Sequence, residues 1–190
     1  MQLDINSIPV LSMSNLLSIT NSSLAQTDSN SSQATQQFLR LYLMPDTTAL
    51  LPIQQVTEVL IIPKGQIVPI SHMPPWVMGV YNWRGEILWM IDMAHLVGLT
   101  PWHQQESNVS TYTAIVLQGH SNQAKANLML GLIANRVEDI EWCNPDLIQS
   151  PPSSALTPEL IPFLRGYWLK SNGDMLAVMD GAALMAAMPN

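Results

Sequence analysis

One motif occurs twice in the chain, and this internal repeat constrains the fold more than any other feature. Residues 75–97 and residues 162–185 follow the same order: Pro, an apolar segment, Gly, a second segment, a turn ending in Gly and an acid, a third segment, Asp and a short apolar stretch. Gly79 matches Gly166 at an offset of 87, whereas Asp92 matches Asp180 at an offset of 88. The second copy therefore has one more residue at its turn, and two copies predict two similar lobes.

The apolar residues outside the repeat also favour strands. From Phe38 onward they come mostly in short bursts, which Pro, Gly, Asn and Ser separate. This pattern is typical of strands and turns, and the short spacing favours an antiparallel barrel or sandwich over a βαβ sheet. Asp92 and Asp180 each precede a short apolar stretch, where a carboxylate accepts hydrogen bonds from unpaired backbone N–H groups. We predict a mainly β fold with two short helices.

The two turns of the repeat differ in composition. The second turn, "SNGD", contains Asn-Gly, the strongest local signal for a tight hairpin with positive φ. The first, "NWRG", has Asn82 and Gly85 at its ends, which predicts a type I turn with Trp83 and Arg84 at an exposed corner. Because neither indole nor guanidinium helps a chain to reverse, Trp83 and Arg84 are candidate functional residues. Of the six tryptophans, Trp83 is the one expected to be exposed.

Composition excludes several classes of function. The chain has 190 residues, 47% of them hydrophobic, which supports a packed interior. With 14 acidic and 7 basic residues the formal charge is −7, so no broad basic surface is available for nucleic acid. The single cysteine, Cys143, excludes an internal disulfide and is expected to be a packing residue.

The first 36 residues are expected to be a disordered extension, and residues 37–190 to be the folded domain. The segment "TNSSLAQTDSNSSQATQQ" has too few apolar residues to recover its ordering entropy by burial. The N-terminus lacks the basic and continuously apolar regions of a secretory signal, and no run is long enough to span a membrane. A cytoplasmic protein without membrane insertion is therefore expected.

Catalytic and metal-binding motifs are not evident. The four histidines form no i, i+4 pair and have no cysteine cluster nearby, so no metal site is predicted. The sequence has no G-x-S-x-G elbow, P-loop or dinucleotide fingerprint. We expect no enzymatic activity and no cofactor.

The segments "LPIQQVTEVL", "GVYNWRGEILWMID", "LGLIANRVEDI" and "FLRGYWLKSNGDMLAVMD" occur in an order that resembles the CheW-like chemotaxis coupling proteins. Their most specific part is Gly-Val-x-Asn-x-Arg-Gly followed by Ile-Asp, and the resemblance extends over most of the predicted domain. It implies two small five-stranded SH3-like barrels packed around a shared hydrophobic centre. Trp83 departs from the family, which commonly has Leu at this position.

The resemblance also implies a function without chemistry. Family members are adaptors that join a chemoreceptor to a CheA-type histidine kinase, binding the regulatory domain of the kinase and the hairpin tip of the receptor. By position, Glu58, Trp83 and Arg84 would face the kinase, and Val56 and Gly79 the receptor.

Several alternatives stay open at this level. Arg84 could be a structural staple of its turn or a direct contact. In "EILWMID" both alternating faces are apolar, so the second face is either buried against the other lobe, the favoured interpretation, or a docking surface. Alternative functions are a coupler of a twitching-pilus or phototaxis system that uses residues 1–19 as a docking peptide, and a ligand-binding β-domain.

Overall fold

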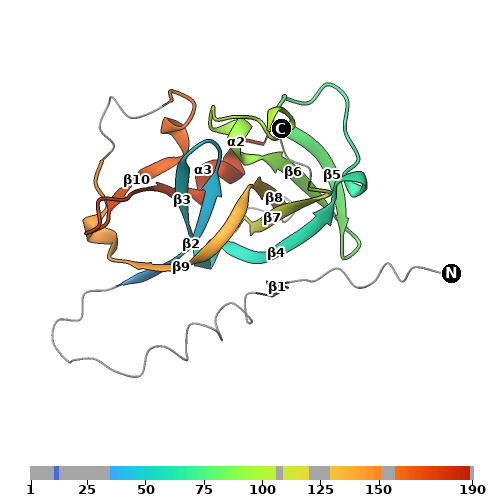
Figure 1. The fold of residues 1–190 in the computed structure, drawn as a ribbon. Coiled ribbons are helices and arrows are strands. Elements are labelled where there is room, and N and C mark those ends of the chain that lie inside the picture. Colours follow the sequence, from blue (N-terminus) through green and yellow to red (C-terminus); the bar gives the residue numbers. More distant parts are fainter. Residues whose placement is uncertain (1–10, 13–34, 106–108, 120–128, 151–156, 189–190) are drawn as a thin grey trace.

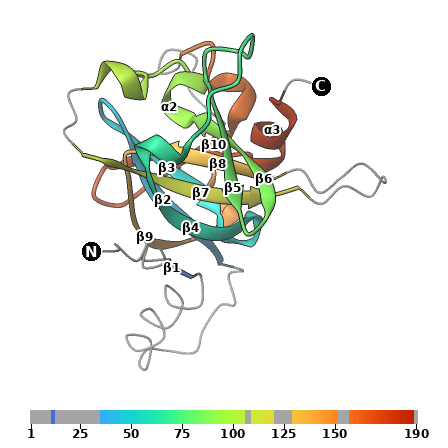
Figure 2. The same ribbon diagram turned by 90° about the vertical axis from the view of Figure 1, so that its right-hand side faces the viewer.

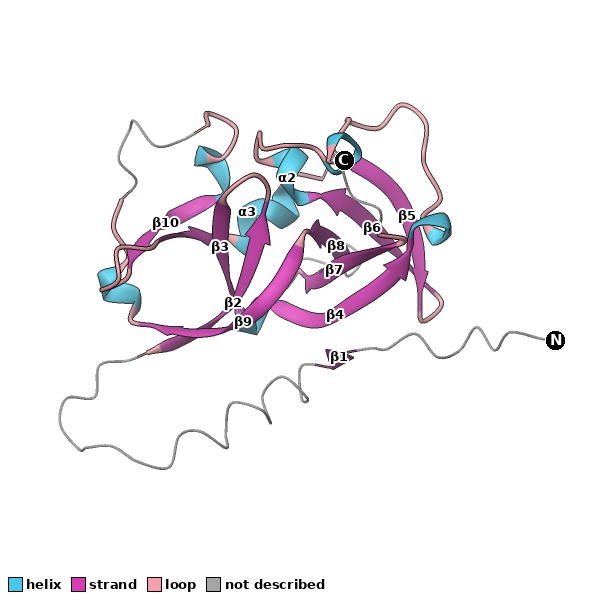
Figure 3. Cartoon of the chain, viewed as in Figure 1, coloured by secondary structure: helices cyan, strands magenta, loops and turns pink. Residues whose placement is uncertain are grey.

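The computed structural model describes residues 11–12, 35–105, 109–119, 129–150 and 157–188, and shows two β-lobes side by side (Figure 1). Strands dominate and the helices are short (Figure 3). The strands are β1 (Leu11–Ser12), β2 (Gln36–Leu43), β3 (Thr47–Pro52), β4 (Val56–Pro63), β5 (Val77–Trp83), β6 (Glu86–Asp92), β7 (Thr111–Gln118), β8 (Met129–Ala134), β9 (Arg136–Cys143), β10 (Leu164–Leu169) and β11 (Met175–Met179). The α-helices are α2 (Met93–Leu96) and α3 (Gly181–Ala186), and the 3-10 helices are η1 (Ile53–Gln55), η2 (Lys64–Gln66), η3 (Trp102–Gln104), η4 (Pro145–Leu147) and η5 (Ile161–Phe163).

The first lobe is built on five strands from the middle of the chain. Its sheet has the order β1-β4-β7-β8-β6-β5, in which β6 and β8 are parallel and the short β1 lies at the edge of β4. The preceding loop meets β5 at Val68, which exchanges two backbone hydrogen bonds with Val80 at 2.8 and 2.9 Å. This bridge lets the sheet curl into a small barrel.

The second lobe combines both ends of the described domain. Its five-stranded sheet has the order β10-β11-β3-β2-β9, so the hairpin β2–β3 pairs with strands about a hundred residues or more later in the chain. A bridge between Gln149 and Tyr167 corresponds to the bridge of the first lobe, because Tyr167 matches Val80 in the repeat. The expected mainly β fold of two five-stranded lobes is confirmed.

Three hydrophobic cores account for the arrangement of the lobes. One core lies inside the first lobe, around Leu60, Leu88 and Met90, and a second lies inside the other lobe, around Phe38 and Val178. The third and largest joins the lobes; it includes Leu39, Leu41, Leu43, Leu51, Val59, Ile91, Ile115, Leu132, Met179 and Leu184. The helices α2 and α3 lie close together at one end of the molecule, where the lobes meet (Figure 2). This third core is the shared hydrophobic centre.

The turn of the first hairpin differs from the prediction. Trp83 pairs with Glu86, so the loop consists of Arg84 and Gly85 alone, with φ values of +56° and +86°. Two positive φ values exclude a type I turn and define a type I′ turn, whose twist matches the strands. The corner is therefore Arg84–Gly85, and Trp83 ends the strand. Gly85 N–H is bonded to the Asn82 side chain at 2.9 Å.

The second turn contains the extra residue of the repeat. Lys170 N–H donates to the Asp174 carbonyl at 2.8 Å, which leaves a loop of three residues, 171–173. Gly173 has a φ of +91°, as the Asn-Gly signal predicts. The insertion inferred from the two offsets is thus the difference between a two-residue and a three-residue hairpin.

Both predicted helix caps are present. Asp92 accepts a hydrogen bond from His95 N–H, and Asp180 accepts from Ala182 and Ala183 N–H. No helix in the described parts of the chain is long and apolar enough to cross a membrane. Of the predicted extension, most residues fall outside the described ones, and Leu11 and Ser12 pair with Val59 and Glu58.

Candidate functional site

Glu58 and Val56 are two residues apart on β4, yet they lie on opposite faces of the sheet. Val56 pairs with Leu117 on β7, and Glu58 pairs with the next β7 residue, Val116. The strand β4 thus has one extra residue at this point, which is a β-bulge at Thr57. Val56 is consequently packed in the shared core with Val59, instead of sharing a face with Leu60. The bulge separates the predicted receptor-facing residue from the predicted kinase-facing one.

Glu58 is buried, with only 3% of its surface exposed, and it is fully engaged by the first turn. Arg84 Nη2 lies 2.9 Å from its Oε1 and 3.0 Å from its Oε2, and Trp83 Nε1 donates to Oε2 at 3.1 Å. The guanidinium carbon is 4.8 Å from the centre of the Trp83 ring, within cation–π range. A buried carboxylate needs such partners, because its desolvation is costly when it is unpaired.

The two charges of this pair differ sharply in exposure. The Arg84 side chain is 66% exposed, whereas that of Glu58 is 4% exposed. Trp83 is half-buried against the first-lobe core, so the prediction that it is the exposed tryptophan is wrong. The exposed tryptophan is Trp142, at 44%, because it lies on the edge strand β9. The ion pair thus fixes the exposed guanidinium of Arg84 against the buried carboxylate of Glu58.

The strand after the turn, β6, has apolar residues on both faces, and the structure shows what covers each face. Leu88 and Met90 point into the first-lobe core, Ile91 belongs to the shared core, and Trp89 packs against it. Ile87 is different, because it is 67% exposed. Inter-lobe burial therefore covers most of the second face and ends at Ile87. We call Trp83, Arg84 and Ile87 the turn surface, which extends over both faces of the hairpin, because Trp83 pairs with Glu86 and Ile87 with Asn82.

Gly79 and Val56, the predicted receptor-facing residues, present no exposed side chain. Gly79 has a φ of +138°, and a Cβ atom there would lie 2.1 Å from the Val68 carbonyl oxygen. Only glycine allows the backbone approach that closes the barrel. Val56 is 8% exposed. Gly79 shapes the first lobe, and Val56 packs in the shared core.

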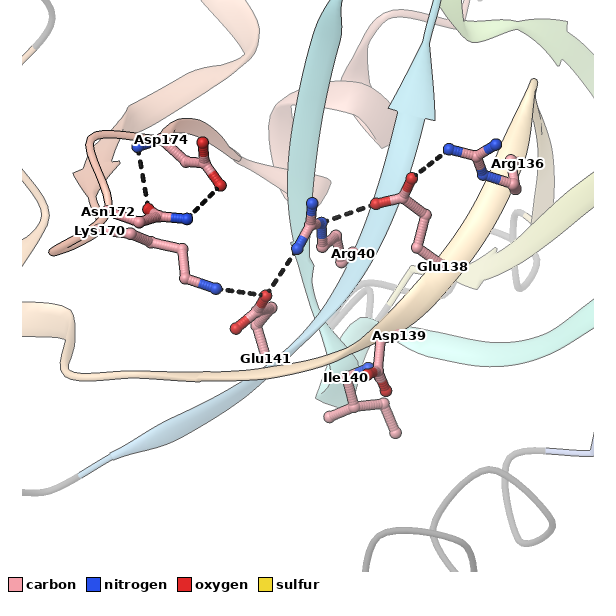
Figure 4. A network of polar contacts seen from close by, with 9 residues as sticks. All are labelled: Arg40, Arg136, Glu138, Asp139, Ile140, Glu141, Lys170, Asn172 and Asp174. Atoms are coloured by element: carbon pink, nitrogen blue, oxygen red, sulfur yellow. Dashed lines mark hydrogen bonds and ion pairs between the residues drawn. The ribbon is translucent and has the colours of Figure 1, made fainter.

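A second charged cluster, which the sequence did not suggest, lies on the other lobe (Figure 4). Arg40 on β2 pairs with Glu138 at 2.7 Å and with Glu141 at 3.0 Å, both on β9. Lys170, after β10, pairs with Glu141 at 2.8 Å. Burial raises the pKa of Glu141, but the hydrogen bonds from Lys170 and Arg40 outweigh it and hold that pKa below its usual value. Arg40, a single charged residue within the apolar segment "FLRLYL", was the available signal.

Fold and site together define a protein-binding scaffold. The first lobe's candidate residues form an ion pair and an exposed turn, with no nucleophile and base in contact among them. Cys143 does not supply a nucleophile, because it is completely buried and burial raises the pKa of its thiol to about 11.

Comparisons with known proteins identify the family. A model of the CheW-like domain matches residues 38–188, so the chain belongs to the CheW-like family. The scaffolding protein TtCheW of Thermoanaerobacter tengcongensis has a similar fold, with a TM-score of 0.61 and 20% identity over 77% of this chain and 89% of that one. No curated protein matches the sequence. The chain is a non-enzymatic scaffolding adaptor of chemotaxis signalling, as the resemblance implied.

Proposed function

We propose that this protein joins the regulatory domain of a CheA-type histidine kinase to the hairpin tip of a chemoreceptor in the cytoplasm, and that the turn surface contacts the kinase. The observation that carries the proposal is the exposed guanidinium of Arg84, held in place by the buried carboxylate of Glu58. A fixed cation loses little side-chain entropy when a partner binds it.

The arrangement leaves Arg84 free to bind a second partner. Its hydrogen bonds to Glu58 come from Nη2, and Nε and Nη1 have no partner among the described residues, so they can bind a carboxylate or backbone carbonyls. Ile87 adds exposed apolar area next to the turn, on the other face of the hairpin, and the half-buried Trp83 ring supports the guanidinium. Apolar area beside an anchored arginine is the composition of a protein-binding hot spot.

In this proposal Glu58 acts through Arg84, since it is too buried to touch a partner itself. Val56 and Gly79 act in the same indirect way on the receptor side, by holding the first lobe in shape. Each contact can be modest, because an array of adaptors, kinases and receptors multiplies weak contacts through effective concentration.

The test is calorimetric titration of the full chain with the regulatory domain of a CheA-type kinase. The informative variant is Arg84→Asn, because asparagine accepts the positive φ of this turn while the charge is lost. We expect Kd to increase about tenfold, which corresponds to about 1.4 kcal/mol. The matched control is Arg165→Asn, an exposed arginine on β10 of the other lobe, for which we expect no change.

Two results would contradict the proposal. If Arg84→Asn lowers the melting temperature but binds the kinase domain as tightly as the wild type, Arg84 is a structural staple only. If the wild type gives neither heat nor a shift in sedimentation, the partner is another protein.

A further inference from the structure

Three potential metal ligands lie together where α2 begins. Asp92, His95 and His103 each offer one ligand atom, and these atoms all lie within 4.8 Å of one another. Asp92 is buried, His95 is half-buried and His103 is exposed. The two imidazole rings are 6.0 Å apart and inclined by 59°. The spacing of eight residues between the histidines is not a motif, so the cluster could not be predicted from the sequence.

The internal repeat shows that the helix cap does not require these histidines. Asp180 caps α3 in the second lobe as Asp92 caps α2, yet the residue that corresponds to His95 is Ala183. The second copy therefore builds the same cap with a methyl group at this position. His95 needs another explanation.

His95 also leaves one polar atom without a partner. Its Nδ1 is buried and makes no hydrogen bond with any residue that the structure describes. A buried polar atom without a partner is costly and rare in native proteins. The lone pair of a neutral imidazole nitrogen is also the commonest donor to transition metals in proteins. A cation bound by this nitrogen would satisfy it.

The carboxylate of Asp92 brings the second histidine close and retains capacity for a metal. Its Oδ2 accepts from Trp102 N–H at 2.7 Å, which fixes the start of η3 and thus the neighbouring His103. Its Oδ1 accepts from His95 N–H at 3.1 Å. A carboxylate offers about four lone-pair positions, so about two remain.

We propose that Asp92, His95 and His103 bind one divalent transition-metal ion of the Zn²⁺ class. Two imidazoles and one carboxylate suit Zn²⁺, with water in the fourth position. Ligand bonds of about 2.1 Å place tetrahedral ligand atoms about 3.4 Å apart, and the exposed His103 can make the small approach required. The ion would tie α2 to η3 and would offset the buried charge of Asp92.

The test uses the full chain without an affinity tag. Co²⁺ is the spectroscopic probe, because a tetrahedral site gives intense visible absorption, and Zn²⁺ is titrated by calorimetry. We expect one equivalent of Zn²⁺ to bind, to displace Co²⁺ and to raise the melting temperature. His103→Ala, at an exposed position, should weaken binding by at least about tenfold.

Two further variants make the result decisive. His95→Ala copies the residue of the second lobe, so it should fold and lose the site. His72→Asn is the matched control, because asparagine accepts the φ of +64° at this exposed position, and it should bind as the wild type does. The proposal is overturned if Zn²⁺ fails to bind the wild type at millimolar concentration, or if it binds His103→Ala and His95→Ala as tightly as the wild type.

Discussion

At the scale of single residues, Arg84 is placed against its local preference. It has a φ of +56°, a conformation that costs a residue with a side chain roughly 1–2 kcal/mol and that Gly or Asn would adopt more easily. Its two contacts with Glu58 compensate for this cost. From the sequence one could infer that turn geometry does not require Arg84. One could not infer that its partner is Glu58, 26 residues earlier on β4.

Trp83 has a physical role that the leucine expected from the resemblance could not fill. Leucine could fill part of the same space but could neither donate to Glu58 nor support the guanidinium. We predict that Trp83→Leu lowers the free energy of unfolding by about 1–2 kcal/mol, because the buried carboxylate loses a donor. Urea denaturation measures this change.

The comparison variant for this prediction is Trp83→Phe, which keeps an aromatic ring beside Arg84 but lacks the N–H group together with the five-membered ring that carries it. Its loss of stability should fall between those of the wild type and Trp83→Leu. Equal stability of all three proteins would mean that the indole bond to Glu58 contributes nothing measurable.

At the scale of elements, the charged cluster of Figure 4 holds three strands of the second lobe together. Glu141 on β9 receives Arg40 from β2 and Lys170 from the end of β10. Its pKa is lowered in the folded protein from an ordinary value of 4.5, so the unfolded chain binds this proton more readily. The contribution of Glu141 to stability is therefore complete above pH 4.5 and is lost as the pH falls through the folded pKa.

We predict that Lys170→Met reduces this acid sensitivity. Removing one hydrogen-bonding cation moves the pKa of Glu141 back toward its ordinary value, so stability should change less between neutral pH and pH 3 than in the wild type. Denaturant midpoints across this range, measured at low salt, provide the comparison. Lys64→Met is the control, because Lys64 lies over Trp102 and Tyr112 and forms no ion pair with a carboxylate of the described residues. Parallel pH profiles for the wild type and Lys170→Met would contradict the prediction.

Local elements were largely predictable from the sequence, and deviations from regularity were not. The repeat predicted both hairpins, the extra residue in the second and both aspartate caps, since these depend on short-range chemistry. The type I′ turn was missed because Arg is unusual at positive φ. The bulge at Thr57 was missed because alternation alone would place Val56 and Glu58 on one face. Long-range pairing of β2 with β9 also leaves no local signal.

At the scale of the whole molecule, the chain path prevents the lobes from being independent. The hairpin β2–β3 comes first in the domain but pairs with β9 and β11. The strands of the first lobe, β4 to β8, therefore lie in the sequence between the two parts of the second lobe. The shared core then takes Leu41 from one lobe and Leu132 from the other. Neither lobe can separate without exposing this largest core.

We predict that the two lobes unfold in one cooperative transition, and that a cavity in the shared core weakens both equally. Leu132→Ala, which removes a fully buried side chain, should cost about 2–5 kcal/mol. Amide exchange of Val116 reports on the first-lobe core and that of Val178 on the second-lobe core. Under conditions where exchange requires global unfolding, both amides should lose the same free energy of protection, although Leu132 lies in only one lobe.

Leu176→Ala, in the second-lobe core, should behave in the same way if the domain is one unit. Loss of protection confined to Val178 in Leu176→Ala would instead show two lobes that open separately.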